Sequence, residues 1–437
     1  MSGPGRIVII GGGAAGLPAA IAAAREAAAC KEQVTVTILD ANDVPGKKLL
    51  STGNGRCNLS NRVQKRDCYR SGSGLLPERF YRDGWDLEIE EFMRSLGVLL
   101  HERKDGYLYP RTDQARTVQQ ALIREAQRLG VGMISGVRVL ECRSVNSGYV
   151  LETQPRGRVA ADRIVLAAGG MVSKTYGCRG DGYRLLPLRH RESPPVPALC
   201  ALHSDDPYLK LASGVRTSAS LTLLLDAEPI AQAEGELQLT DDGISGIPAF
   251  QISRYASRAI ARPGSDDNLR PDLTVRIDFL PEISREDWEK ECGRRLLAVH
   301  PSDTLGDFCR GLVPDRAAAW ILAGFGLVRE KKLANLNRPR GETAASAEAG
   351  RELLRNILNE MRSRTIRITG TESFDKAQVT AGGIAMDEIK DTMESARCPG
   401  CYLAGELLDV DGMCGGYNMT WAIHSGLLAG RSAVRSL

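Results

Sequence analysis

The chain has 437 residues, 43% of them hydrophobic and 25% charged, so it is long enough for two or three domains around a large buried core. This composition excludes a disordered chain and a small disulfide scaffold. The 57 Lys and Arg residues almost balance the 54 Asp and Glu residues, which leaves a net charge of +3 and no basic run typical of nucleic-acid binding. Eleven scattered cysteines, with no recognisable secretion signal, predict a reducing, cytoplasmic location.

An uncharged segment at residues 7–24 has the length of a membrane span or of the apolar part of a secretion signal. It divides, however, into four apolar strand-forming residues, a glycine turn and an alanine-rich helix that contains Pro18. We therefore expect a soluble strand–turn–helix unit here and no membrane partner.

That unit carries the glycine pattern of a dinucleotide site. Gly11, Gly13 and Gly16 lie between the strand and a helix that runs to about residue 29. The first glycine permits a tight turn, the second lets the backbone approach a pyrophosphate, and the third lets the helix pack on the strand. A second strand, at residues 34–39, ends in Asp40, at the spacing where a carboxylate binds the hydroxyls of an adenosine ribose.

Later segments predict FAD rather than NAD, because a flavoprotein of the two-dinucleotide-binding type crosses its cofactor several times and an NAD domain needs only the first half. Residues 163–170 form a further buried strand that ends in small residues, after a helix at 112–129 and a strand at 137–139. Residues 400–406 form a third strand that ends in a glycine and an acid, and a helix follows from about residue 418 to 430.

Two long segments, 43–61 and 404–422, resemble the signature stretches of the bacterial flavoprotein family that includes aminoacetone oxidase-like proteins and a bile-acid 3-dehydro-Δ4,6-reductase. The resemblance covers nearly the whole chain. It implies bound FAD and an α/β fold with a discontinuous Rossmann-like, glutathione-reductase-like FAD-binding domain. This domain would comprise residues 1–195 and 365–437, interrupted by a β-barrel-like insertion at 196–280 and a helical insertion at 281–364.

The same resemblance implies the residues that contact the cofactor through phosphate, ribose, adenine, ribityl or ring. They are Gly11, Gly13, Ala14, Ala15, Gly16, Asp40, Ala41, Lys47, Lys48, Asn58, Val139, Ala168, Gly169, Gly405, Glu406, Asn418 and Met419. For the two lysines a solvated loop is an equally good interpretation, and for Glu406 the alternative is an acid that only starts a helix. Gly415 and Gly416 are expected to let the backbone lie against the flat flavin ring.

The sequence identifies no catalytic residue. Cys57, within the first signature, is expected to pack or to take a redox role beside the flavin. Tyr107, Tyr109 and Arg111 form a polar aromatic patch that lines a substrate cavity or packs with exposed tips. His424, one turn into the last helix, either lines a substrate cavity or is an ordinary histidine of the core or surface.

Two further features are a cysteine pair near residue 400 and the segment after residue 170. Cys398 and Cys401 have CxxC spacing, but no second pair accompanies them, so we expect a turn and no metal. After residue 170 the chain departs from the family, because Lys174, Cys178 and Arg179 add positive charge and bulk where small hydroxyl side chains are usual. This departure leaves the substrate preference open.

The leading hypothesis is therefore an FAD-dependent oxidoreductase that exchanges a hydride between flavin N5 and a small organic substrate. A reductase would take electrons from NAD(P)H and reduce an activated double bond, whereas an oxidase would take them from an amine or alcohol and reduce oxygen. The chain lacks a second strand–GxGxxG–helix unit, so NAD(P)H would dock only transiently. A different class of function is an FAD-binding component of an RNA-modifying complex, which the near-neutral charge disfavours.

Overall fold

A computed structural model describes residues 4–146, 148–186, 189–262, 271–336 and 344–437. The chain divides into two compact units, one made of residues up to Pro197 together with Phe374–Leu437, and the other of Ala198–Ser373. Each unit has its own hydrophobic core. The first unit therefore combines both ends of the chain, as the sequence predicts for a discontinuous Rossmann-like domain.

The centre of the first unit is a five-stranded parallel sheet in the order β21-β12-β1-β2-β8. Its strands are β1 (Gly5–Ile10), β2 (Val34–Asp40), β8 (Gly132–Ser135), β12 (Arg163–Leu166) and β21 (Cys401–Leu403). Ile7, Ile9 and Val165 are completely buried, as both-face coverage of a parallel sheet requires. The sheet places the C-terminal ends of β1, β12 and β21 at one edge, where ligands bind in open α/β sheets.

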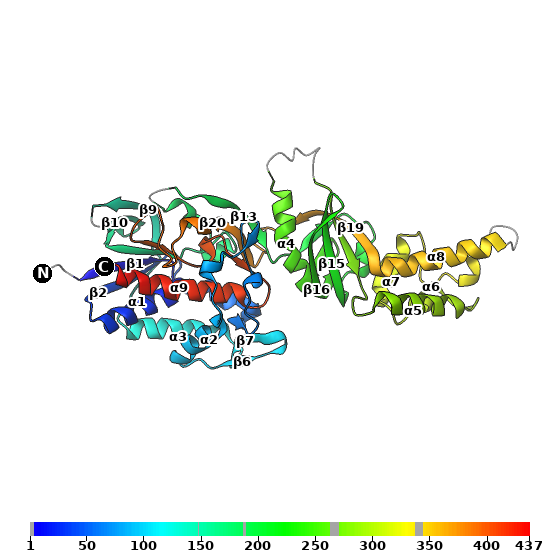
Figure 1. Ribbon diagram of the computed structural model, residues 1–437, viewed down its shortest axis with the longest axis horizontal. Coiled ribbons are helices and arrows are strands. Elements are labelled where there is room, and N and C mark those ends of the chain that lie inside the picture. The colour runs from blue at the N-terminus through cyan, green and yellow to red at the C-terminus, as the bar shows by residue number, and fades with distance from the viewer. Residues whose placement is uncertain (1–3, 147, 187–188, 263–270, 337–343) are drawn as a thin grey trace. The chain divides into compact units, whose positions relative to one another are not determined.

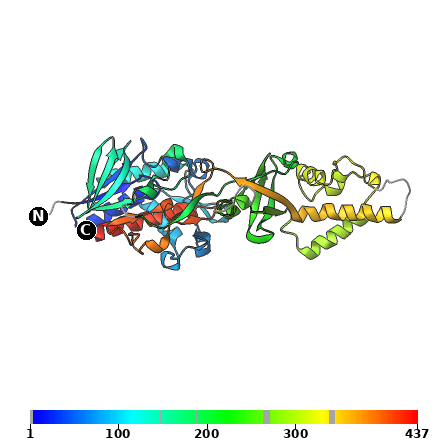
Figure 2. The same ribbon diagram turned by 90° about the horizontal axis from the view of Figure 1, so that it is seen from above.

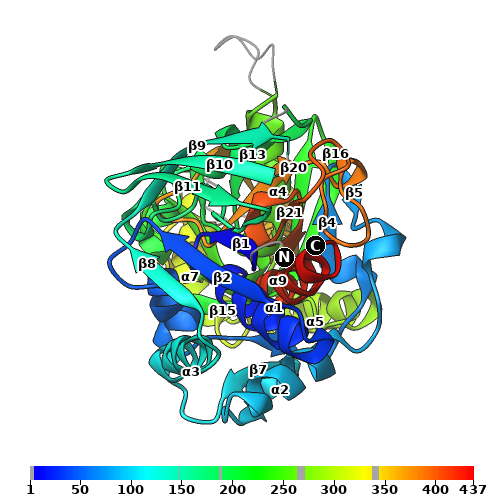
Figure 3. The ribbon, with the colours of Figure 1, turned by 90° about the vertical axis from the view of Figure 1, so that its left-hand side faces the viewer.

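Helices cover one face of this sheet and an antiparallel meander covers the other (Figure 3). The helices on that face are α1 (Gly16–Cys30), α3 (Ala115–Arg128) and α9 (Tyr417–Arg435), and the meander is β9 (Arg138–Val145), β10 (Gly148–Gln154) and β11 (Gly157–Ala161). A further helix, α2 (Trp85–Ser95), packs against α9. The apolar residues at 7–24 thus belong to β1 and α1, as expected. Among the described residues, no helix is long and apolar enough to cross a membrane.

The first and last helices lie side by side (Figure 1). Two glycines one turn apart on α9 permit this close approach: a Cβ atom at Gly426 would lie 2.2 Å from the carbonyl oxygen of Ala15, and one at Gly430 would lie 2.1 Å from that of Ala19. The close packing fixes the N-terminal end of α9 relative to the glycine turn before α1.

Short strands complete the first unit. They form three small sheets, β13-β20, β22-β4-β5 and β3-β7-β6. Their bounds are β3 (Ser60–Asn61), β4 (Tyr69–Ser71), β5 (Gly74–Leu75), β6 (Leu100–Glu102), β7 (Tyr107–Pro110), β13 (Glu192–Ala198), β20 (Val379–Ile384) and β22 (Asp411–Gly412). The hydroxyl of Thr420 donates to Oγ of Ser60 at 2.8 Å, which joins the two signature segments of the sequence.

The second unit begins as a closed antiparallel barrel in the order β14-β17-β16-β15-β18-β19. Its elements are β14 (Leu202–Ser204), β15 (Arg216–Leu225), β16 (Glu228–Leu239), β17 (Gly243–Gly246), β18 (Leu273–Asp278), β19 (Arg364–Thr371) and a helix against β16, α4 (Ile247–Ile260). The predicted barrel is confirmed. The structure differs from the sequence boundary at residue 365, because β19 pairs with β14 and β18 and closes the barrel.

Helices occupy the remainder of this unit (Figure 2). They are α5 (Arg285–Leu297), α6 (Leu305–Cys309), α7 (Asp315–Ala323) and α8 (Ala344–Ser363), and they confirm the predicted helical part; residues 337–343 of that segment lie outside the described residues. Trp320 on α7 and Met361 on α8 share one core with the barrel strands. The barrel and the helices therefore pack as one unit.

Candidate functional site

The glycine turn after β1 has two structural glycines and one that faces open space. A Cβ atom at Gly11 would lie 2.4 Å from the carbonyl oxygen of Ala167, and one at Gly16 would lie 1.8 Å from that of Gly11. No atom lies within 4 Å of the Cβ position of Gly13. The first and third glycines thus allow the strand, turn and helix to pack, whereas the second leaves the backbone open to a ligand.

The N-terminus of α1 presents unpaired donors at this turn. The helix has no side-chain cap and no acidic residue in its first turn. The backbone N–H groups of Gly13, Ala14, Ala15 and Gly16 donate to no acceptor among the described residues. Unpaired N–H groups and the positive end of the helix dipole favour an anion. The turn therefore fits the pyrophosphate of a dinucleotide.

Asp40, at the end of β2, is 5% exposed and is held by fixed donors. Its Oδ2 accepts the N–H of Gly12 at 2.7 Å, and its Oδ1 accepts the backbone N–H of Asn42 at 2.7 Å and the side-chain amide of Asn42 at 3.0 Å. A carboxylate accepts about four hydrogen bonds, so Asp40 has room for one more donor, such as a ribose hydroxyl. Ala41 is exposed beside it, and Val139 is buried at the start of β9.

The two lysines predicted to lie near the phosphates, Lys47 and Lys48, have different partners in the structure. Lys47 forms a surface ion pair with Asp43 at 3.0 Å, whereas Lys48 turns inward and places its Nζ 2.8 Å from Oε2 of Glu406. Burial disfavours the charge on Lys48, but the negative charge of Glu406 outweighs it, so the pKa of Lys48 is raised. The other oxygen of Glu406 accepts the N–H of Thr380 at 2.8 Å. Both oxygens of the predicted ribityl ligand thus already have a protein donor.

A glycine in the left-handed conformation follows each of β12 and β21, at the edge of the sheet where the glycine turn lies. Gly169, beside the half-buried Ala168, has φ 75°. Gly405 also has φ 75°, and its N–H donates to Oγ of Ser425 at 3.0 Å. A Cβ atom at Gly405 would lie 2.9 Å from Cβ of Ala15. Close approach therefore requires glycine at the third strand end.

The paired glycines before α9 face protein atoms. A Cβ atom at Gly415 would lie 2.9 Å from the ring of Tyr107, and one at Gly416 would lie 2.5 Å from the carbonyl oxygen of Ser60. Both glycines have positive φ, 127° and 99°. The packing of β3 and β7 against both positions therefore requires glycine there, and the expected approach of this backbone to the flat flavin ring stays a prediction.

Two asparagines fix the start of α9. The Asn58 amide nitrogen donates to the carbonyl oxygen of Ser60 at 2.9 Å, and its oxygen accepts the N–H of Gly416 at 3.3 Å. The side chain of Asn418 bonds both backbone groups of Gly412, at 2.8 and 2.9 Å. These contacts hold both side chains in place at the start of α9, and the contact of these residues with the cofactor stays a prediction.

The N-terminus of α9 is itself a second anion-favouring end. The helix has no side-chain cap and no acid in its first turn, and the N–H groups of Asn418 and of the half-buried Met419 donate to no acceptor among the described residues. Two uncapped helix ends, at α1 and α9, thus belong to helices packed against each other. This arrangement fits a cofactor that is negative at its pyrophosphate and becomes negative at its ring on reduction.

The loop between these ends holds backbone strain. Asn54 and Cys57 have φ of 55° and 62°, beside the left-handed Gly53 and Gly55, and strained residues of this kind cluster at functional sites. The Cys57 side chain is completely buried. Burial raises its pKa to about 11, although a hydrogen bond with Thr52 lowers the pKa in part. Cys57 is therefore a neutral thiol at physiological pH, which disfavours the redox alternative.

A polar aromatic patch joins the two signature segments. Tyr107 and Tyr109 lie on the same side of β7, and both are half-buried. A Cβ atom at Gly415 would lie 2.9 Å from Cε1 of Tyr107, and a Cβ atom at Gly53 would lie 3.5 Å from Cε1 of Tyr109. Burial raises the pKa of Tyr107 to about 12 and that of Tyr109 above its usual value, so both phenols remain O–H donors. Arg111 is exposed at the end of this strand.

A charged group that sequence reasoning missed supports this patch. The guanidinium of Arg103 lies 4.8 Å from the Tyr109 ring centre and pairs with Asp113 at 2.5 Å. Asp113 also accepts from His101 at 3.0 Å. In the sequence, the alternation of polar residues along β6 and β7 is the signal that could have predicted this network.

His424 belongs to the core, one of the two expected alternatives. It is 5% exposed, its Nδ1 lies 2.5 Å from Glu88 Oε2, and its ring centre lies 4.5 Å from that of Trp85. A histidine held in this way fixes α2 on α9 and has no open face for a substrate.

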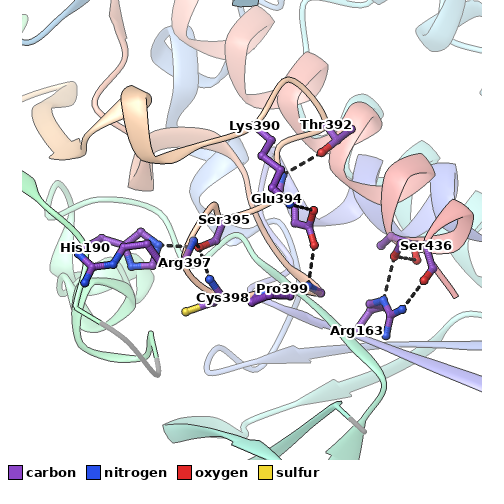
Figure 4. Close-up of polar contacts among 12 residues, drawn as sticks. Arg163, His190, Lys390, Thr392, Glu394, Ser395, Arg397, Cys398, Pro399 and Ser436 are labelled. Atoms are coloured by element: carbon purple, nitrogen blue, oxygen red, sulfur yellow. Dashed lines mark hydrogen bonds and ion pairs between the residues drawn. The ribbon is translucent and has the colours of Figure 1, made fainter. Parts of the chain in front are cut away.

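The CxxC segment forms a turn, as expected (Figure 4). Oγ of Ser395 accepts the N–H groups of Arg397 at 3.0 Å and Cys398 at 2.8 Å, and it lies 2.7 Å from Nε2 of His190. Cys398 and Cys401 are buried free thiols, and burial raises the pKa of Cys401 well above its usual value. Among the described residues, no group of His, Cys, Asp or Glu is arranged to hold a metal.

The Rossmann-like sheet, the glycine turn and the acid at the end of β2 define an α/β fold of the kind that binds dinucleotides, with an inserted barrel. Residues 5–432 match the family model described as the HI0933-like protein Rossmann domain. The chain belongs to this family, and the family prediction is confirmed.

Two characterised relatives extend over almost the whole chain. It is 39% identical to the 3-dehydro-bile acid delta(4,6)-reductase of Clostridium scindens, over 98% of each protein. It is 26% identical to the ribosomal RNA dihydrouridine synthase of Escherichia coli, over 95% of this chain and 94% of that protein. Among solved structures, the Mycobacterium smegmatis Sdh1 complex matches with 17% identity and a TM-score of 0.45, over 100% of this chain and 70% of that one. The relatives support a redox enzyme.

Proposed function

We propose that this chain is an FAD-dependent reductase of a carbon–carbon double bond conjugated to a carbonyl group in a small organic substrate, with NAD(P)H as the electron donor. The observation that carries the proposal is the 39% identity, along the full length of both chains, to a bile-acid reductase. A 3-dehydro bile acid with 4,6 double bonds is a conjugated ketone. Dihydrouridine, the product of the other relative, is likewise a pyrimidine whose conjugated double bond has been saturated.

The chain's own groups suit this chemistry. When bound, FAD accepts a hydride from the donor and gives it to the substrate. The N–H groups of Gly13, Ala14 and Ala15 would hold its pyrophosphate, Asp40 would hold its ribose, and the end of α9 would face its ring. The dipole at an uncapped helix end stabilises nearby negative charge by about 0.3–2 kcal/mol, which tunes the reduction potential.

Hydride addition to the β-carbon of a conjugated carbonyl leaves the α-carbon in need of a proton. Tyr107 is our candidate donor, because its pKa of about 12 keeps the phenol protonated at neutral pH while an enolate carbon is far more basic. Tyr109 would then donate a hydrogen bond to the carbonyl oxygen, and Arg103 over its ring would favour the negative charge that develops there.

Two alternatives lead to different products. A flavin oxidase of an amine or alcohol would use the same cofactor groups, but neither relative described above is named as an oxidase. An RNA substrate is favoured by the 26% identity to the ribosomal RNA enzyme, and it is disfavoured by a net charge of only +3 over 437 residues. Retention of ribosomal RNA fragments by the protein at low salt, lost at high salt, would support the RNA alternative.

The test is an absorbance spectrum of the purified protein, followed by anaerobic addition of NADH or NADPH and then of a conjugated steroid ketone. The proposal predicts a flavin spectrum, bleaching by a nicotinamide nucleotide, and recovery of the spectrum on addition of the ketone without oxygen. A protein that remains colourless after addition of FAD would refute the cofactor, and recovery only on admission of oxygen would favour the oxidase.

A further inference from the structure

A cavity of about 560 Å³ lies in the first unit beside the segment that departs from the family pattern. Its volume is within the roughly 300–1,000 Å³ usual for pockets that hold small molecules. Its lining residues come from residues 171–195: Met171, Arg179, Gly180, Asp181, Tyr183, Arg184, Leu186, Arg189, Glu192 and Pro195. None of the residues predicted to hold FAD lines it.

Three arginines give the cavity its charge. The side chains of Arg179, Arg184 and Arg189 are exposed and form no ion pair or hydrogen bond with any described residue. Of the two acids in the lining, Asp181 is already paired with Arg138, which leaves Glu192. Unpaired guanidiniums therefore outnumber unpaired carboxylates three to one in the lining, and this charge favours an anionic ligand.

The chemistry of the three groups favours phosphate. A guanidinium binds a carboxylate or a phosphate through two parallel N–H bonds. One arginine satisfies a carboxylate in this way, whereas a phosphate offers three oxygens to several arginines at once. Lys174, close by in sequence, adds to the positive field.

The cavity wall is continuous with the predicted cofactor site. The N–H of Gly180 donates to the carbonyl oxygen of Gly170 at 3.3 Å, just after Ala168 and Gly169. A Cβ atom at Gly182 would lie 3.1 Å from Cβ of Ala168. The segment that lines the cavity therefore packs directly against the residues that follow β12.

We propose that this cavity binds a phosphate group of the nicotinamide dinucleotide that reduces the flavin. The inference rests on the proposed function, which requires such a donor, and it accounts for recognition of that donor by a chain without a second glycine-turn unit. Arg179, Arg184 and Arg189 would hold the phosphate through charge-assisted hydrogen bonds.

The test is calorimetric titration of the oxidised protein, in which no turnover occurs, with NADP⁺, NAD⁺, 2′,5′-ADP, ADP and sodium acetate. Arg179→Gln, Arg184→Gln and Arg189→Gln are each expected to weaken binding of the nucleotides about tenfold, the size of one charge-assisted hydrogen bond. Arg285→Gln, which removes an equally charged side chain that is 93% exposed in the second unit, is the matched control and should bind as the wild type does.

The outcomes separate the sources of phosphate. Stronger binding of 2′,5′-ADP than of ADP assigns the cavity to a 2′-phosphate, and the reverse assigns it to the pyrophosphate; both support the proposal if the arginine variants lose that binding. Unchanged binding in all three variants overturns it, as does binding of acetate in place of every nucleotide.

Failure of this inference is distinct from failure of the proposed function. If dithionite-reduced protein still reduces a conjugated ketone while the arginine variants bind nucleotides normally, the function stands and the cavity assignment falls. If the nucleotides bind through the arginines but no ketone is reduced, the cavity assignment stands and the proposed reaction falls.

Discussion

Gly13→Val is the most informative substitution, because it should weaken cofactor binding without disturbing the folded glycine turn. No atom lies within 4 Å of its Cβ position, and its φ is outside the left-handed region, so the folded protein without cofactor accommodates the side chain. The new methyl groups would occupy the space in front of the unpaired N–H groups of α1. Loss of two charge-assisted hydrogen bonds costs about 3–6 kcal/mol, which weakens FAD binding by about 100- to 10,000-fold.

The assay combines flavin content after purification with thermal unfolding of the protein stripped of flavin. Gly13→Val should purify without colour and unfold within about 2 °C of the wild type, since a surface substitution changes stability by about 0.5 kcal/mol or less. Gly74→Val, at a glycine whose Cβ position is equally open, should retain its flavin. Gly16→Ala should instead destabilise the protein, because its Cβ would lie 1.8 Å from the Gly11 carbonyl oxygen. Full flavin occupancy in Gly13→Val would refute the reasoning.

Three other predictions concern charge and proton supply. Lys48→Met should lower the free energy of unfolding by about 1–3 kcal/mol by leaving Glu406 without its cation, and the double variant with Glu406→Gln should recover part of the loss in denaturant titrations. The hydrogen bond with Arg128 lowers the pKa of Glu125 to about 2. The stability that this ionised carboxylate contributes is therefore present above about pH 4.5 and is lost as the pH falls through 2. Glu125→Gln should cost about 1–2 kcal/mol of unfolding free energy at pH 7, and this cost should vanish near pH 2. Tyr107→Phe should leave flavin content and NAD(P)H bleaching unchanged but slow ketone reduction by about 100-fold or more in stopped-flow traces; an unchanged rate excludes Tyr107 as the proton donor.

Local patterns in the sequence were sufficient for the core of the first unit. The turn at Gly11–Gly16 and the acid at Asp40 follow from adjacent residues, since a glycine pattern between a strand and a helix restricts the backbone to one arrangement. The hydrogen bond from the N–H of Gly12 to Asp40 was not predicted. The inward turn of Lys48 was not predicted either, because its partner Glu406 is 358 residues away.

The same limit explains the other differences. β19 was assigned to the cofactor domain because nothing in residues 364–371 reveals their pairing with β14 and β18. The close neighbours of the paired glycines before α9 are Ser60 and Tyr107, which are distant in sequence, so the packing that requires glycine there could not be predicted. The arginine-lined cavity was visible only in part, since the sequence singled out Arg179 but could not bring Arg184 and Arg189 to it.

The central claim is that reduced flavin on this chain gives its hydride to a conjugated double bond. The most direct measurement mixes the flavin-loaded protein, reduced with dithionite under argon, with one equivalent of a 4,6-dien-3-one steroid, and follows the flavin and dienone absorbance together. The flavin is expected to reoxidise while an equal amount of dienone is lost. A flavin that stays reduced beside an intact dienone, and reoxidises only when oxygen is admitted, would contradict it.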